Sequence, residues 1–396
     1  MSFEFATAGR IVFGCGTLTQ AAPAAAAFGR RALVVTGRNP ERAAPLLDAL
    51  RKEGVTVETF AVSGEPTIEN ARQAAALSAD VVIGFGGGSV IDLAKAAAAL
   101  MTNPGDPLDY LEVIGKGLPL TERPSPCIAI PTTAGTGAEV TKNAVLASPE
   151  HKVKVSMRHP LMIPDLAIVD PECTLSMPPA VTASTGLDAL TQLLEAFISK
   201  KANPMTDGFC REGLPRAVRA LRRVFENGDD LAAREEMAMA SLFGGLALAN
   251  AGLGAVHGFA GPLGGMFSAP HGMVCAALLP YVMKANLVGQ ASLYSESLCA
   301  SGGLEPTRSR IREACPTMID RFDEFARMTG SSTAEEGIDW LAGLCRDLQV
   351  PPLSSLGITE ADFPEIVEKS KNSSSMKGNP VELSDAELTR ILSVAL

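Results

Sequence analysis

Histidine is scarce in this chain of 396 residues, which has four, and aromatic residues make up only 5%. Long apolar runs are missing too, since no uninterrupted stretch approaches the ~20 residues that a membrane helix needs. A nucleic-acid surface is not expected, because the formal net charge is −10 and lysine and arginine are not clustered. The one short basic run, 216–223, is interleaved with Ala, Val and Leu and is typical of a solvated helix face. These absences predict a globular protein without membrane or nucleic-acid partners.

Two further signals are lacking. The N-terminus has no basic segment followed by an apolar core, so no export signal is predicted and a cytoplasmic location is the default expectation. The eight cysteines, at positions 15, 127, 173, 210, 275, 299, 315 and 345, form no CxxC pair. This favours reduced, mostly buried structural thiols over a disulfide framework or a zinc knuckle.

The first 177 residues alternate β-branched apolar runs with Ala-rich amphipathic stretches. Predicted strands lie at 31–37, 55–62, 80–88, 126–133, 152–157 and 166–170. Predicted helices lie at 40–54, 67–79 and 89–100. This alternation is typical of an α/β domain with a doubly wound, mostly parallel sheet, and the last three strands are expected to complete the sheet and its edge.

After residue 177 the residue pattern changes to long segments rich in Ala, Leu and Glu. Their spacing predicts helices at 180–200, 207–227, 230–250, 273–286 and 334–348, with a last short helix after a polar loop at 371–380. The Pro178–Pro179 pair can end one element and open the next helix. We therefore predict two domains, an α/β nucleotide-binding domain at 1–177 and an all-helical metal and substrate domain at 178–396.

A glycine-rich loop stands where a buried strand meets a helix, in "VVIGFGGGSVIDLAKA" (81–96). Only glycine lets backbone N–H groups and the positive end of a helix approach a phosphate this closely. The loop is neither a complete GxGxxG fingerprint nor a Walker loop, and a plain tight turn is the alternative. A second polar loop, "IPTTAGTGAEVT" (130–141), also follows a predicted strand. Two such loops would line one crevice of a doubly wound sheet and favour a nucleotide cofactor, although an ordinary surface turn would also fit the second loop.

Asp188 and Gln192 stand four residues apart on a predicted helix, so they share one face. His257 and His271 lie in "AVHGFAGPLGGMFSAPHG" (255–272), and each precedes a glycine that would leave room for cofactor and substrate. An Asp and two His from separate helices suit Fe²⁺ or Zn²⁺, whereas Gln192 offers only a neutral amide oxygen. The alternative is a helical bundle in which Asp188 caps or pairs and both imidazoles are satisfied core groups.

Together these motifs resemble the iron-containing (group III) alcohol dehydrogenase family. The resemblance rests on "GGGSVIDLAK", "PTTAGTGAEVT", "DP" at 170–171 with "MPP" at 177–179, "TGLDALT", "GLGAVHGFAGPLGG", "PHG" and the late "MKGNP". It implies a nucleotide-binding α/β domain followed by an all-helical domain, with cofactor and metal in the cleft between them. It also implies a homodimer.

The resemblance assigns roles to individual residues. It implies that the pyrophosphate is held by Gly87, Gly88 and Ser89, with Asp92 nearby. It places Thr132, Thr133 and Thr136 beside the phosphates and nicotinamide, and Lys154 at the ribose. The family's metal ligands, an Asp and three His, fall on Asp188, Gln192, His257 and His271, and three of these, Asp188, His257 and His271, are the catalytic candidates.

Two positions depart from the family pattern. The family has histidine where this chain has Gln192, which changes the expected affinity and identity of the metal. It also has histidine at the position of Gly261, where a side chain near the active site would help to move the alcohol proton.

Cofactor preference follows from the end of the strand at 31–37. An acidic residue there would hydrogen-bond the ribose of NAD and repel the 2′-phosphate of NADP. The strand ends in Gly37, followed by Arg38 and Asn39, so NADP(H) is favoured over NAD(H). The alternative is that Arg38 simply faces water.

The function predicted from these observations is an NAD(P)-dependent alcohol dehydrogenase or aldehyde reductase acting on a small alcohol or aldehyde. A divalent ion, Fe²⁺ or Zn²⁺, would act as a Lewis acid on the substrate oxygen while hydride passes to or from the nicotinamide. The alternatives are a metal-independent enzyme resembling maleylacetate reductases, a lyase of the dehydroquinate-synthase type, and a nucleotide-binding regulator with a decayed metal site.

Overall fold

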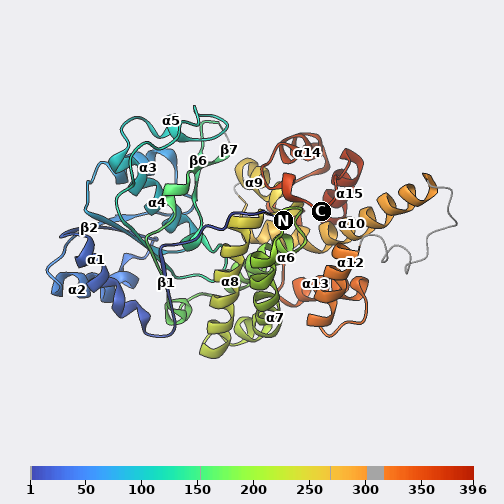
Figure 1. Cartoon of the computed structure of the whole chain (residues 1–396), viewed down its shortest axis with the longest axis horizontal. Coiled ribbons are helices and arrows are strands. Elements are labelled where there is room, and N and C mark those ends of the chain that lie inside the picture. Colours follow the sequence, from blue (N-terminus) through green and yellow to red (C-terminus); the bar gives the residue numbers. More distant parts are fainter. Residues whose placement is uncertain (1, 152, 268, 301–315) are drawn as a thin grey trace.

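The computed structural model describes residues 2–151, 153–267, 269–300 and 316–396. Figure 1 shows a sheet flanked by helices, in blue to green, beside a body of helices, in yellow-green to red. Both halves of the predicted fold class are confirmed: an α/β part with a parallel sheet and a helical part. The predicted boundary at residue 177 stays a prediction.

The main sheet contains six parallel strands in the described part of the chain, in the order β1-β8-β5-β4-β2-β3. They are β1 (Arg10–Phe13), β2 (Arg31–Thr36), β3 (Thr56–Ala61), β4 (Val81–Gly86), β5 (Cys127–Pro131) and β8 (Leu166–Val169). Every residue of β4, β5 and β8 is buried. Strands this apolar need cover on both faces of the sheet, which is the situation in doubly wound folds.

Helices cover both faces of this sheet. Alternate residues of β2 belong to different cores, since Leu33 packs with α3 (Ile68–Ala75) and α4 (Gly88–Thr102). Val34 packs instead with α1 (Ala21–Phe28) and α2 (Ala44–Lys52). The period of two that places neighbouring side chains on opposite faces therefore builds two separate cores around one sheet.

The strand order reverses between β2 and β4. From β2 the chain continues to β3 on one side, and from β4 it continues to β5 and β8 on the other. In open α/β sheets, ligands bind beyond the carboxyl ends of the strands at this switch point. Gly37 follows β2 and the glycine-rich loop follows β4, so both lie at the predicted crevice.

The strand predicted at 152–157 does not join the main sheet. It forms β7 (Val153–Arg158), which pairs antiparallel with β6 (Asn143–Ser148) in a two-stranded hairpin. The connection between the two strands is short, which allows antiparallel pairing but not a parallel crossover. Sequence reasoning missed β6 and the four-residue β1, because both carry a weak strand signal.

The helical part has nine described α-helices. Their bounds are α6 (Pro179–Ile198), α7 (Pro204–Glu226), α8 (Leu231–Ala251), α9 (Ala255–Phe267), α10 (His271–Ala300), α12 (Pro316–Met328), α13 (Ala334–Asp347), α14 (Phe363–Lys371) and α15 (Asp385–Ala395). The five helices predicted there and the last short helix are confirmed. Helices α9, α12 and α14 were not predicted; in α9, glycines and an internal proline interrupt the helical pattern.

Glycine contacts join the two parts. A Cβ at Gly135, in the loop after β5, would come within 2.7 Å of Thr185 on α6. Gly137, with φ +59°, lies against the backbone of Gly245 on α8, where a Cβ would come within 2.3 Å. The second polar loop is therefore pressed directly onto the helical part, so its position relative to α6 is tightly constrained.

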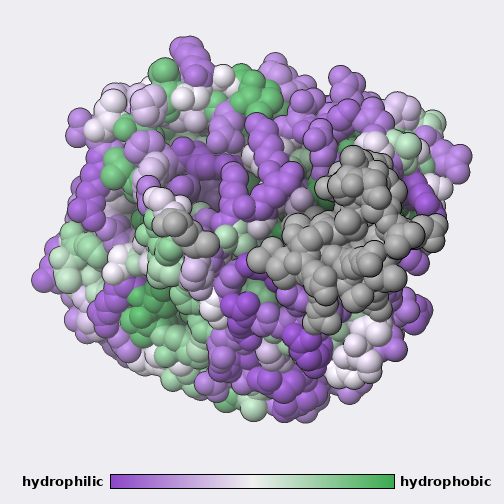
Figure 2. All heavy atoms as spheres, turned by 45° about the vertical axis from the view of Figure 1, so that its right-hand side comes forward, coloured by the Kyte–Doolittle hydropathy of each residue, from purple (hydrophilic) through white to green (hydrophobic). Residues whose placement is uncertain are grey.

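Helix α10 bears on the question of membranes. Its segment His271–Gly289 is long and apolar enough to cross a bilayer, and 61% of it is buried inside the molecule. Helices α8 and α9 meet the same criteria only as a pair, bent by 98°. Core helices of globular proteins also pass such a test, and the face drawn in Figure 2 is mostly hydrophilic with apolar side chains in separate patches. The absence of a membrane partner stays a prediction.

The six cysteines whose side chains are described are all free. Cys127, Cys210, Cys275 and Cys345 are buried, as predicted. Cys173 is half-buried and Cys15 is exposed. Cys299 and Cys315 fall outside the described side chains. The prediction of reduced, mostly buried thiols agrees with the described set.

Buried Glu139 generates a prediction about stability. It lies in the short helix η3 (Ala138–Val140) and is 2% exposed, and burial raises its pKa from 4.5 to about 7. At a pH between these two values, Glu139 is ionised in the unfolded chain but still protonated in the folded chain. Its contribution to the free energy of unfolding is therefore full below about pH 4.5 and is lost as the pH rises to about 7. Glu139→Gln should remove this dependence, which amounts to about 2–3 kcal/mol between pH 5 and pH 8.

The measurement is the free energy of urea unfolding of both proteins at pH 5 and pH 8. All other titrating groups cancel in the difference between the two proteins. Equal changes with pH in both would contradict the assignment to Glu139.

Candidate active site

The N-terminus of α4 is open toward the crevice. Gly87 precedes the helix, no described side chain caps it, and the first turn carries no acidic residue. A Cβ at Gly88 would come within 2.8 Å of Thr136, and one at Gly87 within 3.4 Å of Thr133. Gly88 therefore allows the second polar loop to lie against the first, whereas a Cβ at Gly87 would make an ordinary van der Waals contact. The structure brings the two predicted loops together at one helix N-terminus, which is a favourable place for a phosphate.

The other residues predicted to bind the cofactor lie in or beside the loops around the N-terminus of α4, with the contacts that follow. Ser89 is in the first turn of α4, and the Thr132 N–H donates to the Gly86 carbonyl over 2.9 Å. A Cβ at Gly37 would lie 4.0 Å from Val90 of α4. The exposed Arg38 donates from Nε to Oγ of Ser63 over 3.1 Å, so its side chain lies across the ends of β2 and β3.

Asp92 and Lys154 have protein partners. The Asp92 carboxylate accepts the Val145 N–H at 3.0 Å and pairs with Lys95 Nζ at 3.0 Å, and so holds the hairpin onto α4. Lys154 Nζ pairs with Glu65 at 2.9 Å and lies against α9, where a Cβ at Gly264 would come within 2.9 Å. Lys154 therefore stands between the two parts of the molecule, and its place at the ribose stays a prediction.

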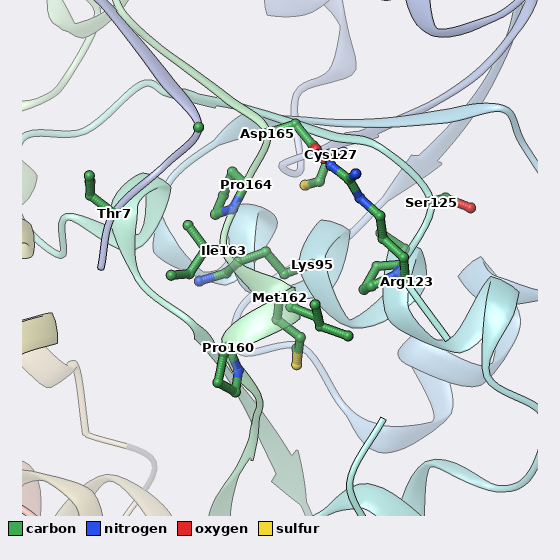
Figure 3. Close-up of a pocket in the computed structure, with 14 residues that line it drawn as sticks. Thr7, Lys95, Arg123, Ser125, Cys127, Pro160, Met162, Ile163, Pro164 and Asp165 are labelled. Atoms are coloured by element: carbon green, nitrogen blue, oxygen red, sulfur yellow. Dashed lines mark hydrogen bonds and ion pairs between the residues drawn. The ribbon is translucent and has the colours of Figure 1, made fainter. Parts of the chain in front are cut away.

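A separate cavity of about 310 Å³ lies at the other end of the strands. Its lining includes Cys127 at the start of β5 and Asp165 just before β8, and Figure 3 shows the Lys95 side chain beside it. Lys95 Nζ donates to Ala138 O at 2.9 Å and Thr141 Oγ1 at 3.0 Å. Because this cavity is far from the strands' carboxyl ends and its buried cation is engaged, it is not the predicted crevice.

A cluster of four donors lies in the helical part. Asp188 comes from α6, His257 from α9, and His271 and Cys275 from α10, and one ligand atom of each lies within 4.8 Å of the others. Asp188 Oδ1 is 3.3 Å from His257 Nε2 and 3.8 Å from His271 Nε2. Cys275 Sγ is 3.8 Å from His271 Nε2. The structure thus brings the three predicted ionisable ligands together and adds a thiol.

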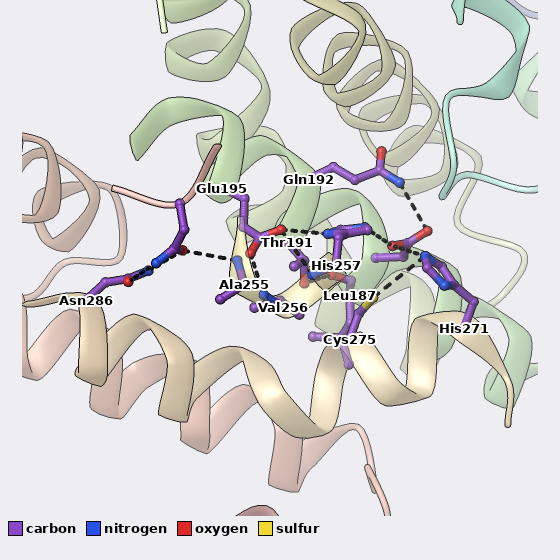
Figure 4. Close-up of polar contacts among 12 residues, drawn as sticks. Leu187, Thr191, Gln192, Glu195, Ala255, Val256, His257, His271, Cys275 and Asn286 are labelled. Atoms are coloured by element: carbon purple, nitrogen blue, oxygen red, sulfur yellow. Dashed lines mark hydrogen bonds and ion pairs between the residues drawn. The ribbon is translucent and has the colours of Figure 1, made fainter. Parts of the chain in front are cut away.

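Glu195 orients the ring of His257. Its buried carboxylate accepts from His257 Nδ1 at 2.7 Å and from the Val256 N–H at 2.7 Å (Figure 4). The carboxylate therefore caps α9 and leaves His257 Nε2 facing Asp188. A carboxylate behind a ligating imidazole is the usual arrangement at metal sites, because it fixes the tautomer.

Asn379, from the late "MKGNP" motif, completes the same helix terminus. Its Oδ1 accepts the Ala255 N–H at 3.0 Å, and its Nδ2 donates to Asn286 at 2.7 Å. A Cβ at Gly378 would come within 2.1 Å of the Leu253 carbonyl, so only glycine fits there. This motif therefore supports the turn between α8 and α9, which positions His257.

The glycines after the two histidines face protein, which corrects the expectation that they leave room for ligands. A Cβ at Gly258 would meet Met376 at 2.8 Å, and one at Gly272 would meet the Ser184 carbonyl at 2.2 Å. They allow α9 and α10 to pack closely on their neighbours. At Gly261, where the family resemblance implies histidine, no described atom lies within 4 Å of an added Cβ.

Gln192 lies beside the cluster with its nitrogen toward it. Nε2 donates to Asp188 Oδ2 at 3.1 Å, and Oε1 has no hydrogen-bond partner among the described residues. That oxygen is directed to α8, 3.3 Å from the position of a Cβ at Gly244. Figure 4 shows it turned away from His257 and Cys275. In this arrangement Gln192 steadies Asp188 and offers no oxygen to the cluster.

The cluster is charge-balanced. Burial opposes charging of the imidazoles, yet Cys275 and Asp188 outweigh it, and the pKa of His271 rises to about 9 and that of His257 well above 6.5. Burial also disfavours the anions, but the two histidines keep the pKa of Asp188 and of Cys275 below their ordinary values. Binding of a cation at these groups would release protons.

Sequence reasoning missed Cys275, Glu195 and Asn379. Cys275 was interpreted as a structural thiol, although it stands four residues after His271 and therefore one helical turn away on the same face. Glu195 is likewise seven residues after Asp188, close to two turns of α6. Asn379 carries no local signal for this role, because Ala255 and Asn286, its partners on α9 and α10, lie 124 and 93 positions away in the sequence.

Comparison with known proteins decides the family. Residues 8–171 match the family model described as "Iron-containing alcohol dehydrogenase", and residues 182–396 match "Fe-containing alcohol dehydrogenase family, C-terminal". This chain belongs to the iron-containing alcohol dehydrogenase family. The stated resemblance is thereby confirmed over both parts of the chain.

Individual relatives agree with this family assignment. The chain is 42% identical to Long-chain-alcohol dehydrogenase 1 of Geobacillus thermodenitrificans, over 79% of this chain and 83% of the relative. It is 35% identical to the 1,3-propanediol dehydrogenase of Klebsiella pneumoniae, over 92% and 90%. A crystal structure of 1,3-propanediol oxidoreductase matches with a TM-score of 0.88 at 32% identity and full coverage of both chains. The chain is an NAD(P)-dependent oxidoreductase acting on the CH–OH groups of alcohols or the corresponding aldehydes.

Glu195 yields a test of the positioning of His257. Glu195→Gln keeps the length of the side chain and an oxygen that can cap α9, but removes the charge behind the imidazole. We expect divalent-metal affinity to fall by about 10- to 100-fold, the usual cost of losing such a partner. Affinity is measured by competition with a chelator.

The control is Glu212→Gln, an exposed glutamate on α7 that pairs with Arg216. Unchanged metal affinity in a folded Glu195→Gln protein would contradict the positioning role.

Proposed function

We propose that this family member is a metal-assisted alcohol dehydrogenase and aldehyde reductase that prefers NADP(H). The observation that carries the proposal is the convergence of Asp188, His257 and His271 within one donor cluster, with the α6 helix of Asp188 packed against the second polar loop. The physiological alcohol or aldehyde is proposed to be small, and the active form a cytoplasmic homodimer.

The proposed cofactor site is the open N-terminus of α4. The glycine-rich loop, with Gly87, Gly88 and Ser89, offers backbone N–H groups to the pyrophosphate, because no described side chain occupies them as a cap. Thr133 and Thr136 border the same point from the second loop. One solved relative, sulfoacetaldehyde reductase from Bifidobacterium kashiwanohense, is described in complex with NAD⁺ and matches with a TM-score of 0.83 at 27% identity.

The donor set fits a divalent metal. Carboxylate oxygen, imidazole nitrogen and thiol sulfur are ligands of Zn²⁺ and Fe²⁺, and their atoms lie close enough to converge on one ion. When bound, the ion supplies Lewis acidity toward the substrate oxygen. Asp188 contributes the negative charge, His257 is held in orientation by Glu195, and His271, with 36% of its side chain exposed, is the member of the cluster that solvent reaches most readily.

Helix α6 connects the two sites. Thr185 touches the second polar loop, and Asp188 stands one turn further along the same helix. A hydride donor held at the loops and a carbonyl held at the cluster would therefore be set by a single rigid element. The metal-independent alternative rested on the missing histidine ligand at position 192. Cys275 supplies a fourth donor atom in the same cluster, which weakens that alternative.

The metal role is tested by removing ligands. Asp188→Ala and His271→Ala should each lower kcat/KM for alcohol oxidation by at least about 100-fold, because Lewis-acid stabilisation is worth several kcal/mol. Stripping the metal with a chelator should have a similar effect, reversed by Zn²⁺ or Fe²⁺. His159→Ala, a half-buried histidine outside the cluster, is the matched control and should retain activity. Wild-type turnover by metal-stripped protein would overturn the metal mechanism.

Cofactor preference is tested at Arg38. Charge-assisted hydrogen bonds to the 2′-phosphate are worth about 1.5–3 kcal/mol, so Arg38→Ala should lower the ratio of kcat/KM for NADP⁺ over NAD⁺ by about 10- to 100-fold. Arg51→Ala removes an exposed arginine from α2 and should leave the ratio unchanged. If Arg38→Ala also leaves it unchanged, Arg38 faces water and the preference is wrongly assigned.

A further inference from the structure

We propose that Cys275, and not Gln192, supplies the fourth protein ligand of the metal, and that the resulting Asp188–His257–His271–Cys275 site prefers Zn²⁺ to Fe²⁺. The inference rests on the proposed metal-assisted function. It concerns how this chain compensates for the position where its family has histidine and this chain has glutamine.

The placement of Cys275 supports ligation. It follows His271 by one turn of α10, so both side chains leave the same face of the helix. Its Sγ is 3.8 Å from His271 Nε2 and belongs to the group of donor atoms within 4.8 Å of one another. Figure 4 shows the sulfur directed toward the two histidines. A tetrahedral zinc shell with bonds of ~2.0–2.3 Å spaces its donor atoms roughly 3.3–3.7 Å apart, close to the 3.3, 3.8 and 3.8 Å that separate three pairs of these donors.

Gln192 is unsuited to the same task. Its nitrogen donates to Asp188 Oδ2, and its oxygen is directed to Gly244 on the far side. To ligate an ion the amide would have to turn over, which would break the hydrogen bond and place its oxygen against the Asp188 carboxylate. Two oxygen atoms carrying negative charge repel at that distance. Gln192 therefore acts on the site by holding Asp188.

Softness favours a zinc site. The negative charge that a Cys275 thiolate adds beside Asp188 and Glu195 helps to hold a buried dication and does not distinguish Zn²⁺ from Fe²⁺. Thiolate is a soft ligand, and carboxylate, imidazole and thiolate together form a set typical of tetrahedral zinc. Replacing one imidazole by a thiolate therefore moves metal selectivity away from Fe²⁺.

The spectrum of the cobalt-substituted protein tests this ligand assignment directly. Metal-stripped protein is loaded with Co²⁺ alone, because a thiolate bound to Co²⁺ gives an intense charge-transfer band in the near ultraviolet. We expect the band in wild type, its loss in Cys275→Ser with cobalt still bound, and its retention in Gln192→Ala. Cys345→Ser, the same change at another buried cysteine whose Sγ contacts Ala276 O, is the matched control and should keep the band.

Metal selectivity provides the second readout. We expect the ratio of Zn²⁺ to Fe²⁺ affinity, measured by anaerobic competition, to fall by at least about 10-fold in Cys275→Ser. A wild-type cobalt protein without the band, or a Cys275→Ser protein that keeps it, would overturn the proposal. So would a loss of metal affinity in Gln192→Ala that exceeds the loss in Cys275→Ser.

X-ray absorption of zinc-loaded wild type needs no variant and covers the case in which Cys275→Ser does not fold. One sulfur at ~2.3 Å in the zinc shell supports the ligand set, and a shell of nitrogen and oxygen alone excludes it. The two proposals fail separately. If the protein oxidises alcohols but its metal has no sulfur ligand, the proposed function stands and Cys275 is rejected as a ligand. If sulfur is bound to the metal but no alcohol or aldehyde is turned over, the ligand assignment stands and the proposed function is rejected.

Discussion

Two carboxylates buried on one face of α6 impose the central constraint on this structure. Asp188 and Glu195 are almost completely removed from solvent, and an ionised carboxylate in that position is very costly unless it is paired and hydrogen-bonded. Glu195 is satisfied by the amide groups at the start of α9 and by His257, and Asp188 by His257 and Gln192. Satisfying them requires α9 to begin where it does and His257 to lie between the two acids. The donor cluster is thus a consequence of how α6 is buried.

The cofactor loops are tied to the same helix by small residues. Gly135 lies against Thr185, and Gly137 against Gly245, with clearances that no side chain would permit. Because Thr185, Asp188, Gln192 and Glu195 recur every three or four residues, one face of α6 passes from the cofactor loop to the donor cluster and on to the cap of α9. Precise placement of two reacting groups is worth several kcal/mol in a bimolecular reaction, and here it depends on backbone contacts rather than on flexible side chains.

Local patterns in the sequence were sufficient to predict most of the helices and strands. Strands β2, β4 and β5 and helices α6, α7 and α8 were predicted because their periodicity is strong and uninterrupted, and the two polar loops because parallel strands end at one edge. Predictions failed where long-range packing decides the outcome. Helix α9 carries glycines that lower its helical propensity and lie close to the side chains of Lys154 and Met376. Strand β7 pairs with β6 in a hairpin instead of joining the main sheet.

The candidate site was predictable to a similar degree. Asp188, His257 and His271 were identified from residue type and family resemblance, whereas Cys275, like Cys210, was interpreted as a structural thiol because the cysteines are scattered without a CxxC pair. Only the fold shows that one of these thiols faces two histidines and the other faces a hydrophobic core. Glu195 was missed for the same reason, since a glutamate on a helix is usually solvated.

The support that Asn379 gives to the α8–α9 turn has a consequence for the order of folding. Asn379 accepts the Ala255 N–H at the start of the helix that carries His257, across 124 positions of the sequence. Gly135 and Thr185, which join the second polar loop to α6, are only 185 − 135 = 50 positions apart. Because the entropy cost of closing a loop grows with its length, we expect the cofactor-loop contact to form before the helix terminus that orients His257.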